Sequence, residues 1–148
     1  MADQTLSDTL RTVHLSRMGE SRWKATNRRG GVLPIGSGED PDFTPVELLL
    51  AAIAGCSAID VELITGKRAA ADSFEIVGQG DKTRDEQGNR MTNLRVTFDV
   101  TFPEGEAGDR AREALPWAID QSRDRLCTVS RTVAVESPVE MGSGSTVT

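Results

Sequence analysis

Histidine and cysteine are scarce in this chain. Its 148 residues include one histidine, His14, and two cysteines, Cys56 and Cys127. No cysteine and histidine spacing typical of a zinc site occurs. The sequence therefore predicts neither a metal site nor a bound cofactor.

Basic residues are also fewer than acidic residues. Lys and Arg total 17 against 23 Asp and Glu, which gives a net charge of −6. That balance argues against a general affinity for nucleic acid or for an anionic membrane. The N-terminus shows no basic segment followed by an apolar one, and the longest charge-free run, residues 48–59, has twelve residues against about 20 needed to span a bilayer. We expect a cytoplasmic protein, in which cysteines are more often free, redox-active or catalytic than joined in a permanent disulfide.

The remaining composition is ordinary for a globular protein, with 37% hydrophobic and 27% charged residues. A chain of this length favours one domain. We expect that domain over residues 9–141, with residues 1–8 and 142–148 as flexible tails.

Alternating and helical patterns divide the chain into strands and two long helices. The expected strands cover residues 11–18, 21–27, 32–35, 72–81, 94–102 and 133–140. Pro34 suits an edge strand. The expected helices cover residues 44–65 and 107–126, with a kink or restart at Pro116 in the second. This order predicts an α+β fold with a mostly antiparallel sheet.

The first helix is apolar on nearly every face, which predicts a buried, central position. Thr44 and Glu47 form a capping-box pattern at its start. Cys56 lies near its middle, with apolar neighbours on the same face. A small buried core residue is the favoured interpretation from this helix alone, since Asp60, one turn later, would raise the pKa of a nearby thiol.

Cys127 follows the second helix in the segment "SRDRLCTVSR". By itself this segment looks like a solvated basic helix end. However, each cysteine lies on or beside one of only two long helices, and such helices tend to pack together. The pair is therefore a modest indication of redox chemistry.

Two segments of the chain resemble the OsmC/Ohr superfamily (osmotically induced protein C and organic hydroperoxide resistance proteins), most closely its OsmC-like branch. They are "TPVELLLAAIAGCSAIDVELI" and, much later, "DRLCTVSRTV". The family pattern is an Ala-rich helix opened by proline and glutamate and carrying a cysteine, then a second cysteine in a C-P-V-S-like motif. Here Thr128 replaces the proline of that motif. The resemblance covers residues 11–140.

The resemblance implies an intertwined homodimer with active sites at the subunit interface. It also implies that Cys56 is a peroxidatic thiol that reduces organic hydroperoxides and that Cys127 is the resolving thiol. The resulting disulfide would be reopened by a dithiol reductant, for example of the lipoyl type. No metal takes part in this chemistry.

The family also uses an arginine and a glutamate to stabilise the thiolate. Glu47 is the candidate glutamate, although the family position corresponds to Val46 and a capping role is favoured. Arg22 is the candidate arginine, with an exposed strand position as the simpler interpretation. His14 is expected as an exposed strand residue, and the two tryptophans as core or dimer contacts (Trp23 and Trp117).

Three interpretations remain open from the sequence. The first is a thiol peroxidase for organic hydroperoxides in oxidative stress defence. The second is a non-enzymatic OsmC-like protein that senses redox state or binds a small molecule. The third, the least favoured, is a structural oligomer with inert thiols.

Overall fold

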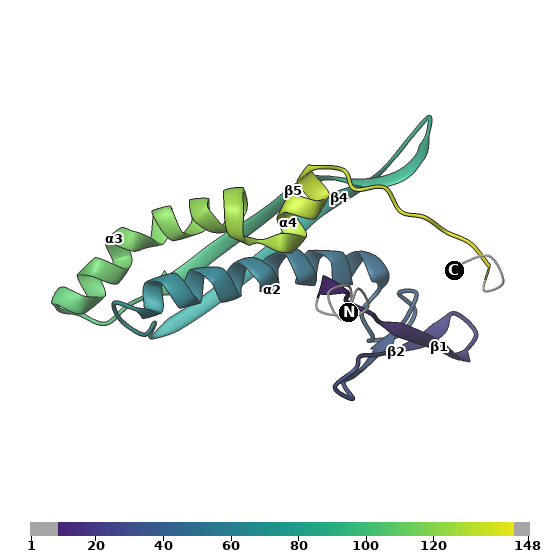
Figure 1. Ribbon diagram of the computed structural model, residues 1–148, viewed down its shortest axis with the longest axis horizontal. Helices are drawn as coiled ribbons and strands as arrows, with labels where there is room; N and C mark the ends of the chain where they lie inside the picture. Colours follow the sequence, from purple (N-terminus) through teal and green to yellow (C-terminus); the bar gives the residue numbers. More distant parts are fainter. Residues whose placement is uncertain (1–8, 144–148) are drawn as a thin grey trace, which may run out of the picture. The chain divides into compact units, whose positions relative to one another are not determined.

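The computed structural model describes residues 9–143, which form two compact units that divide between Leu49 and Leu50 (Figure 1). The tails expected at residues 1–8 and 144–148 lie outside the described residues. A single domain over residues 9–141 stays a prediction.

The first unit contains a three-stranded antiparallel sheet in the order β1-β2-β3. Its strands are β1 (His14–Gly19), β2 (Arg22–Thr26) and β3 (Val32–Ile35), which confirms three of the predicted strands. Pro34 lies on the edge strand β3, opposite Lys24, as predicted. An edge position suits proline because it has no N–H to donate to a neighbouring strand.

Helix α2 (Pro45–Gly66) begins with the predicted capping box. The backbone N–H of Thr44 donates to the Glu47 carboxylate at 3.0 Å, and the N–H of Glu47 donates to the Thr44 hydroxyl at 3.3 Å. The helix has 22 residues and is long and apolar enough to cross a membrane by length and composition. The twelve-residue run noted in the sequence therefore understates the apolar length.

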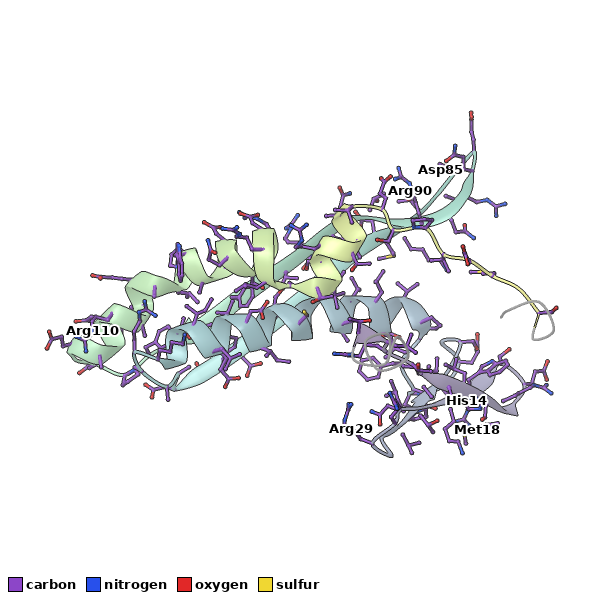
Figure 2. All side chains as sticks on the ribbon, in the orientation of Figure 1. His14, Met18, Arg29, Asp85, Arg90 and Arg110 are labelled. Carbon is purple, nitrogen blue, oxygen red and sulfur yellow. The ribbon has the colours of Figure 1, made fainter. Side chains whose placement is uncertain are left out.

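The second unit is built on a long antiparallel hairpin of β4 (Ser73–Asp85) and β5 (Gly88–Thr101). Its two-residue turn follows Asp85, whose carboxylate accepts from the N–H of Gln87 at 2.9 Å and pairs with Arg90 at 2.9 Å (Figure 2). Side chains alternate between a half-buried and an exposed face. The half-buried face of β5 continues into Phe102, which follows the strand and is buried.

Helices α2 and α3 run alongside this hairpin (Figure 1). The packing of α2 depends on Gly78 of β4, where an added Cβ would lie 3.0 Å from the carbonyl oxygen of Leu50 and 3.2 Å from the Cβ of Ala54. Every fourth residue of one α2 stripe is buried, namely Ile53, Ser57, Val61 and Thr65. Other apolar residues of α2 are exposed in the single chain, among them Ile59 at 61% and Leu63 at 65%. The expectation of a helix buried all round is therefore wrong for one chain.

The second predicted helix is present as α3 (Glu106–Gln121) followed by a π-helical turn, η1 (Ser122–Leu126). Helix α3 continues through Pro116, so the expected restart is wrong, while a kink at Pro116 stays a prediction. The helical geometry changes six residues after Pro116, at Ser122, where the π-helical turn that precedes Cys127 begins.

The strand expected at residues 133–140 is also wrong. Residues Thr128–Ala134 form a short helix, α4, and the chain beyond it has no regular structure up to residue 143. The alternating apolar residues of this segment are exposed, and α4 starts because Cys127 supplies an N-cap. The observed fold is α+β with antiparallel sheets, as predicted, but the strands of the described residues form two sheets rather than one.

Candidate functional site

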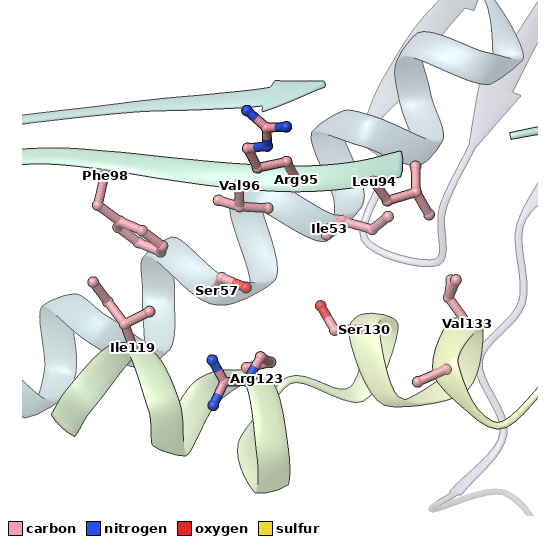
Figure 3. A pocket seen from close by; sticks show the side chains of 11 residues that line it. Ile53, Ser57, Leu94, Arg95, Val96, Phe98, Ile119, Arg123, Ser130 and Val133 are labelled. Atoms are coloured by element: carbon pink, nitrogen blue, oxygen red, sulfur yellow. The ribbon is translucent and has the colours of Figure 1, made fainter. Parts of the chain in front are cut away.

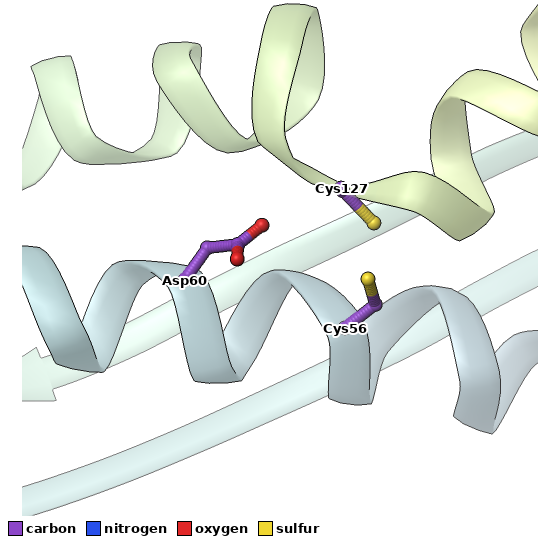
Figure 4. A group of neighbouring side chains, drawn as sticks. All are labelled: Cys56, Asp60 and Cys127. Atoms are coloured by element: carbon purple, nitrogen blue, oxygen red, sulfur yellow. The ribbon is translucent and has the colours of Figure 1, made fainter. Parts of the chain in front are cut away.

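The two cysteines meet in the second unit, although 70 residues separate them in the chain. The sulfur atoms of Cys56 and Cys127 and a carboxylate oxygen of Asp60 all lie within 4.8 Å of one another (Figure 4). Cys56 and Asp60 come from successive turns of α2, and Cys127 comes from the junction of η1 and α4. Both cysteines are free thiols.

The π-helical turn η1 places Cys127. Its backbone N–H donates to the carbonyl of Ser122 at 2.8 Å, which closes a five-residue turn, and its backbone then becomes extended. Such turns are rare and occur often at functional sites. Cys127 next caps α4, where its sulfur accepts from the N–H of Ser130 at 3.3 Å. The side chain is fully buried.

The Cys56 thiol lies at the edge of the buried stripe of α2 and is partly exposed. Its pKa is raised, first because burial disfavours the thiolate and then because the neighbouring Cys127 and Asp60 add negative charge. A hydrogen bond from the backbone of Val129 opposes this shift without cancelling it.

The Cys127 thiol has the opposite shift. Burial raises its pKa, but hydrogen bonds from Ser130, Cys56 and Ser57 together outweigh burial and lower the pKa below that of an ordinary thiol. Cys127 is therefore the more acidic thiol of the pair, and Cys56 donates toward it in the hydrogen bond between them.

Asp60 is held in place by a buried hydroxyl. The Ser122 side chain donates to the Asp60 carboxylate at 2.9 Å and is 1% exposed. This bond links α2 to the first residue of the π-helical turn. It fixes the carboxylate on the side of the sulfur pair.

A cavity of about 310 Å³ lies between α2, β5, α3 and α4, and Ser57 and Ser130 are among its lining residues (Figure 3). Two of its polar lining residues, Ser57 and Ser130, also hydrogen-bond to Cys127. Most of the remaining lining is apolar and comes from α2, β5, α3 and α4, namely Ile53, Leu94, Val96, Phe98, Ile119, Val133 and Ala134.

The other residues predicted from the sequence take part in local contacts. The Arg22 guanidinium pairs with Asp42 at 2.8 Å and Asp40 at 3.5 Å, and its side chain is 51% exposed. Glu47 caps α2, and the Thr44 backbone N–H is the main reason that its pKa is lowered. A role for Arg22 or Glu47 in activating a thiol stays a prediction.

Three further residues that were considered in the sequence are exposed in the structure. His14 is an exposed residue of β1, as expected. Trp23 and Trp117 are 41% and 55% exposed, so neither is a core residue of the single chain. A dimer contact remains a prediction for both tryptophans.

Sequence reasoning missed the three serines that organise the site. Ser57 follows Cys56 directly, and Ser130 is three residues after Cys127, the spacing at which an N-cap residue meets an N–H donor. These two signals were available in the sequence. Ser122 was not identifiable, because its partner Asp60 is 62 residues away and the π-helical turn leaves no pattern of its own.

Known proteins are similar to this chain in sequence. The family model described as OsmC-like protein matches residues 36–142. An uncharacterized protein of Mycobacterium tuberculosis is 29% identical over 129 residues, which cover 86% of this chain and 91% of that protein.

Solved structures share the fold at lower sequence identity. A hypothetical protein from Aquifex aeolicus is 20% identical with a TM-score of 0.69, covering 88% of this chain and 92% of that one. A Legionella pneumophila structure described as an organic hydroperoxide resistance protein OsmC is 16% identical with a TM-score of 0.54, covering 84% of this chain and 90% of that one. The chain described here belongs to the OsmC-like protein family.

Proposed function

We propose that this protein is a thiol-dependent peroxidase for organic hydroperoxides, acting in oxidative stress defence. The observation that carries the proposal is the approach of the Cys56 and Cys127 sulfur atoms to within 4.8 Å. A disulfide has a sulfur–sulfur distance of about 2.05 Å, so the two atoms must close a further gap of at most about 2.8 Å. The name of the Legionella structure agrees with this substrate class.

Cys56 is the proposed peroxidatic residue because it is the more exposed thiol of the pair. Its sulfur attacks one peroxide oxygen, the O–O bond breaks, and the alcohol leaves after protonation. Cys127 accepts the thiol hydrogen bond of Cys56 and is placed to take its proton during attack. Cys56 becomes a sulfenic acid.

Cys127 then acts as the resolving residue. Its sulfur attacks the Cys56 sulfenic acid, a disulfide forms, and water leaves. The two thiols are oxidised by two electrons in total, and ROOH is reduced to ROH and water. A dithiol reductant, for example of the lipoyl type, reopens the disulfide by thiol exchange. In the cytoplasmic setting that we expect from the sequence, such reductants are available.

The 310 Å³ cavity is the proposed site for the organic part of the peroxide. Its lining is mainly apolar and includes Phe98 and Ile119, which suits an alkyl or aryl group. Its hydroxyl edge, at Ser57 and Ser130, adjoins the sulfur pair. We therefore expect bulky apolar hydroperoxides to react faster than hydrogen peroxide.

One observation favours a second function. The raised pKa of Cys56 makes its thiolate scarce at neutral pH, which slows reaction with peroxide. A protein with this pair and an apolar cavity is also suited to redox sensing or to binding a small molecule without turnover. Arg22 and Glu47 are the residues predicted to raise reactivity, and their substitution tests whether either does.

Stopped-flow reduction of cumene hydroperoxide separates these functions. With a dithiol reductant present, wild type should turn over, and Cys56→Ser should consume peroxide at the background rate. Cys127→Ser should react once and then over-oxidise at Cys56 to sulfinic acid, seen by mass spectrometry. Wild type should instead give the cross-linked Cys56–Cys127 peptide pair.

Two outcomes would contradict the proposal. Equal, background rates for all three proteins would assign the fold to sensing or binding. A single turnover retained by Cys56→Ser but lost in Cys127→Ser would reverse the two roles.

A further inference from the structure

Cys56, Asp60 and Cys127 form a group of three possible metal ligands. Peroxide reduction requires the two thiols but not the carboxylate of Asp60. Two sulfurs and one carboxylate oxygen converge within 4.8 Å (Figure 4). Thiolate and carboxylate are both zinc ligands. The sequence does not reveal this combination, because Cys127 is far along the chain from Cys56 and Asp60.

The distances suit one small cation. On a tetrahedral ion with metal–sulfur distances of about 2.3 Å, two sulfur ligands lie about 3.8 Å apart. The two sulfurs therefore need to approach each other by no more than about 1 Å from their 4.8 Å limit. Cys56 and Asp60 are one helical turn apart on α2, so their side chains project from the same side of the helix.

Neighbouring groups hold these donors in position, as outer-shell groups do at metal sites. The buried Ser122 hydroxyl donates to Asp60 at 2.9 Å. The backbone N–H of Ser130 donates to the Cys127 sulfur at 3.3 Å, and the backbone of Val129 donates to Cys56. Each of the three donors thus has its own hydrogen-bond partner.

Access comes from the side of α2. Cys127 is fully buried, whereas Cys56 and Asp60 are partly exposed. An incoming ion would meet the α2 ligands first and Cys127 last. Three protein ligands leave a fourth tetrahedral position for water, as in catalytic rather than structural zinc sites.

We propose that Cys56, Asp60 and Cys127 form, in the reduced protein, a binding site for one thiophilic divalent cation such as Zn²⁺. Binding displaces the thiol protons and joins both sulfurs to the metal. Formation of the Cys56–Cys127 disulfide removes two of the three ligands and so releases the ion. Reduced and oxidised chains therefore differ in metal affinity.

Calorimetric titration of the untagged, reduced protein with Zn²⁺ under anaerobic conditions tests the site. Wild type should bind one ion per chain. Cys56→Ser, Cys127→Ser and Asp60→Asn should each weaken binding at least about tenfold, and Ser122→Ala, which removes an outer-shell bond, by roughly 10–100-fold. Circular dichroism should show that each variant is folded.

Two matched controls exclude other ligands. His14→Ala removes the only imidazole of the chain and should leave the affinity unchanged. Asp99→Asn changes an exposed carboxylate of β5 and should do the same. Titration with Co²⁺ should give a sulfur-to-cobalt charge-transfer band in wild type that the Cys56→Ser/Cys127→Ser double variant lacks.

Release is tested without peroxide, so its result is independent of peroxidase activity. Diamide, an azo oxidant, takes up two electrons from the two thiolates and two protons from the solvent as the disulfide forms. A chromophoric chelator should then report about one ion released per chain. The proposal is overturned if wild type binds no ion, if the double cysteine variant binds as tightly as wild type, or if His14→Ala abolishes binding.

Discussion

At the scale of single residues, the two thiols of one site hold their protons unequally. Hydrogen bonds from Ser130, Cys56 and Ser57 favour the thiolate of Cys127, whereas burial and two negative neighbours disfavour that of Cys56. The buried sulfur is therefore the more acidic one. Burial raises the pKa of both thiols, and the hydrogen bonds and negative charges around each sulfur decide which thiol has the lower pKa.

This inequality predicts an order of titration. The ultraviolet thiolate absorbance of Cys56→Ser, which keeps Cys127, should rise at lower pH than that of Cys127→Ser, which keeps Cys56. A lowered pKa means that the thiolate appears at lower pH, so the sign follows directly. A metal chelator in the buffer removes any effect of bound ions. The reverse order would show that hydrogen bonds do not outweigh burial at Cys127.

At the scale of secondary structure, Gly78 sets how closely α2 approaches the hairpin. A methyl group there would lie 3.0 Å from a backbone oxygen, which cannot move without shifting the helix. We expect Gly78→Ala to destabilise the protein by about 1–3 kcal/mol in urea unfolding, as for other overpacked sites. Gly66→Ala is the matched control, because an added Cβ meets nothing within 4 Å there. Equal effects of the two substitutions would remove the packing role of Gly78.

The cap of α2 supplies a prediction that depends on pH. Thr44→Ala removes the hydroxyl acceptor of the Glu47 N–H and should cost about 1 kcal/mol. The Glu47 pKa is lowered, so its ionised form is held more strongly in the folded state. That contribution is present above the ordinary glutamate pKa and is lost as pH falls through the lowered value. Glu47→Gln should therefore flatten the acid limb of the stability curve measured by urea unfolding, and an unchanged limb would contradict the assignment.

The same scale shows how far the sequence alone predicts the structure. Five strands and both long helices were predictable, because alternation, caps and turn residues act over a few neighbouring positions. The segment after Leu126 was not, since its apolar alternation resembled a strand while the Cys127 cap starts a helix. For the site, the cysteine pair came from family resemblance. The sequence marks Asp60 only as a neighbour that raises the pKa of the Cys56 thiol. Its contact with Ser122 joins residues 62 positions apart and depends on packing that the sequence does not show.

At the scale of the whole molecule, α2 is a core helix of the OsmC-like fold, although its length and composition would also suit a membrane span. In the single chain its exposed side carries Ile59 and Leu63. Apolar side chains of this size are normally covered, and a second copy of the chain is the predicted cover. The homodimer implied by the family resemblance would provide it.

Sedimentation analysis of the purified protein tests this assembly. Wild type should sediment as a dimer at micromolar concentration, and Leu63→Glu should shift it toward monomer because a carboxylate resists burial. Glu62→Gln, on the neighbouring exposed position, is the control and should leave the dimer intact. A stable folded wild-type monomer under these conditions would reject the prediction.

The π-helical turn sets the direction in which Cys127 leaves α3. A π-helical turn holds one residue more than the α-helical turn it replaces. If the five residues Ser122–Leu126 took up α-helical geometry instead, Cys127 would be turned by about 100° around the axis and away from Cys56. Deletion of one residue from this turn has the opposite consequence, because an α-helical turn of the shorter segment leaves Cys127 pointing in nearly the same direction. A relative of this fold could therefore lose one residue here and keep the cysteine pair.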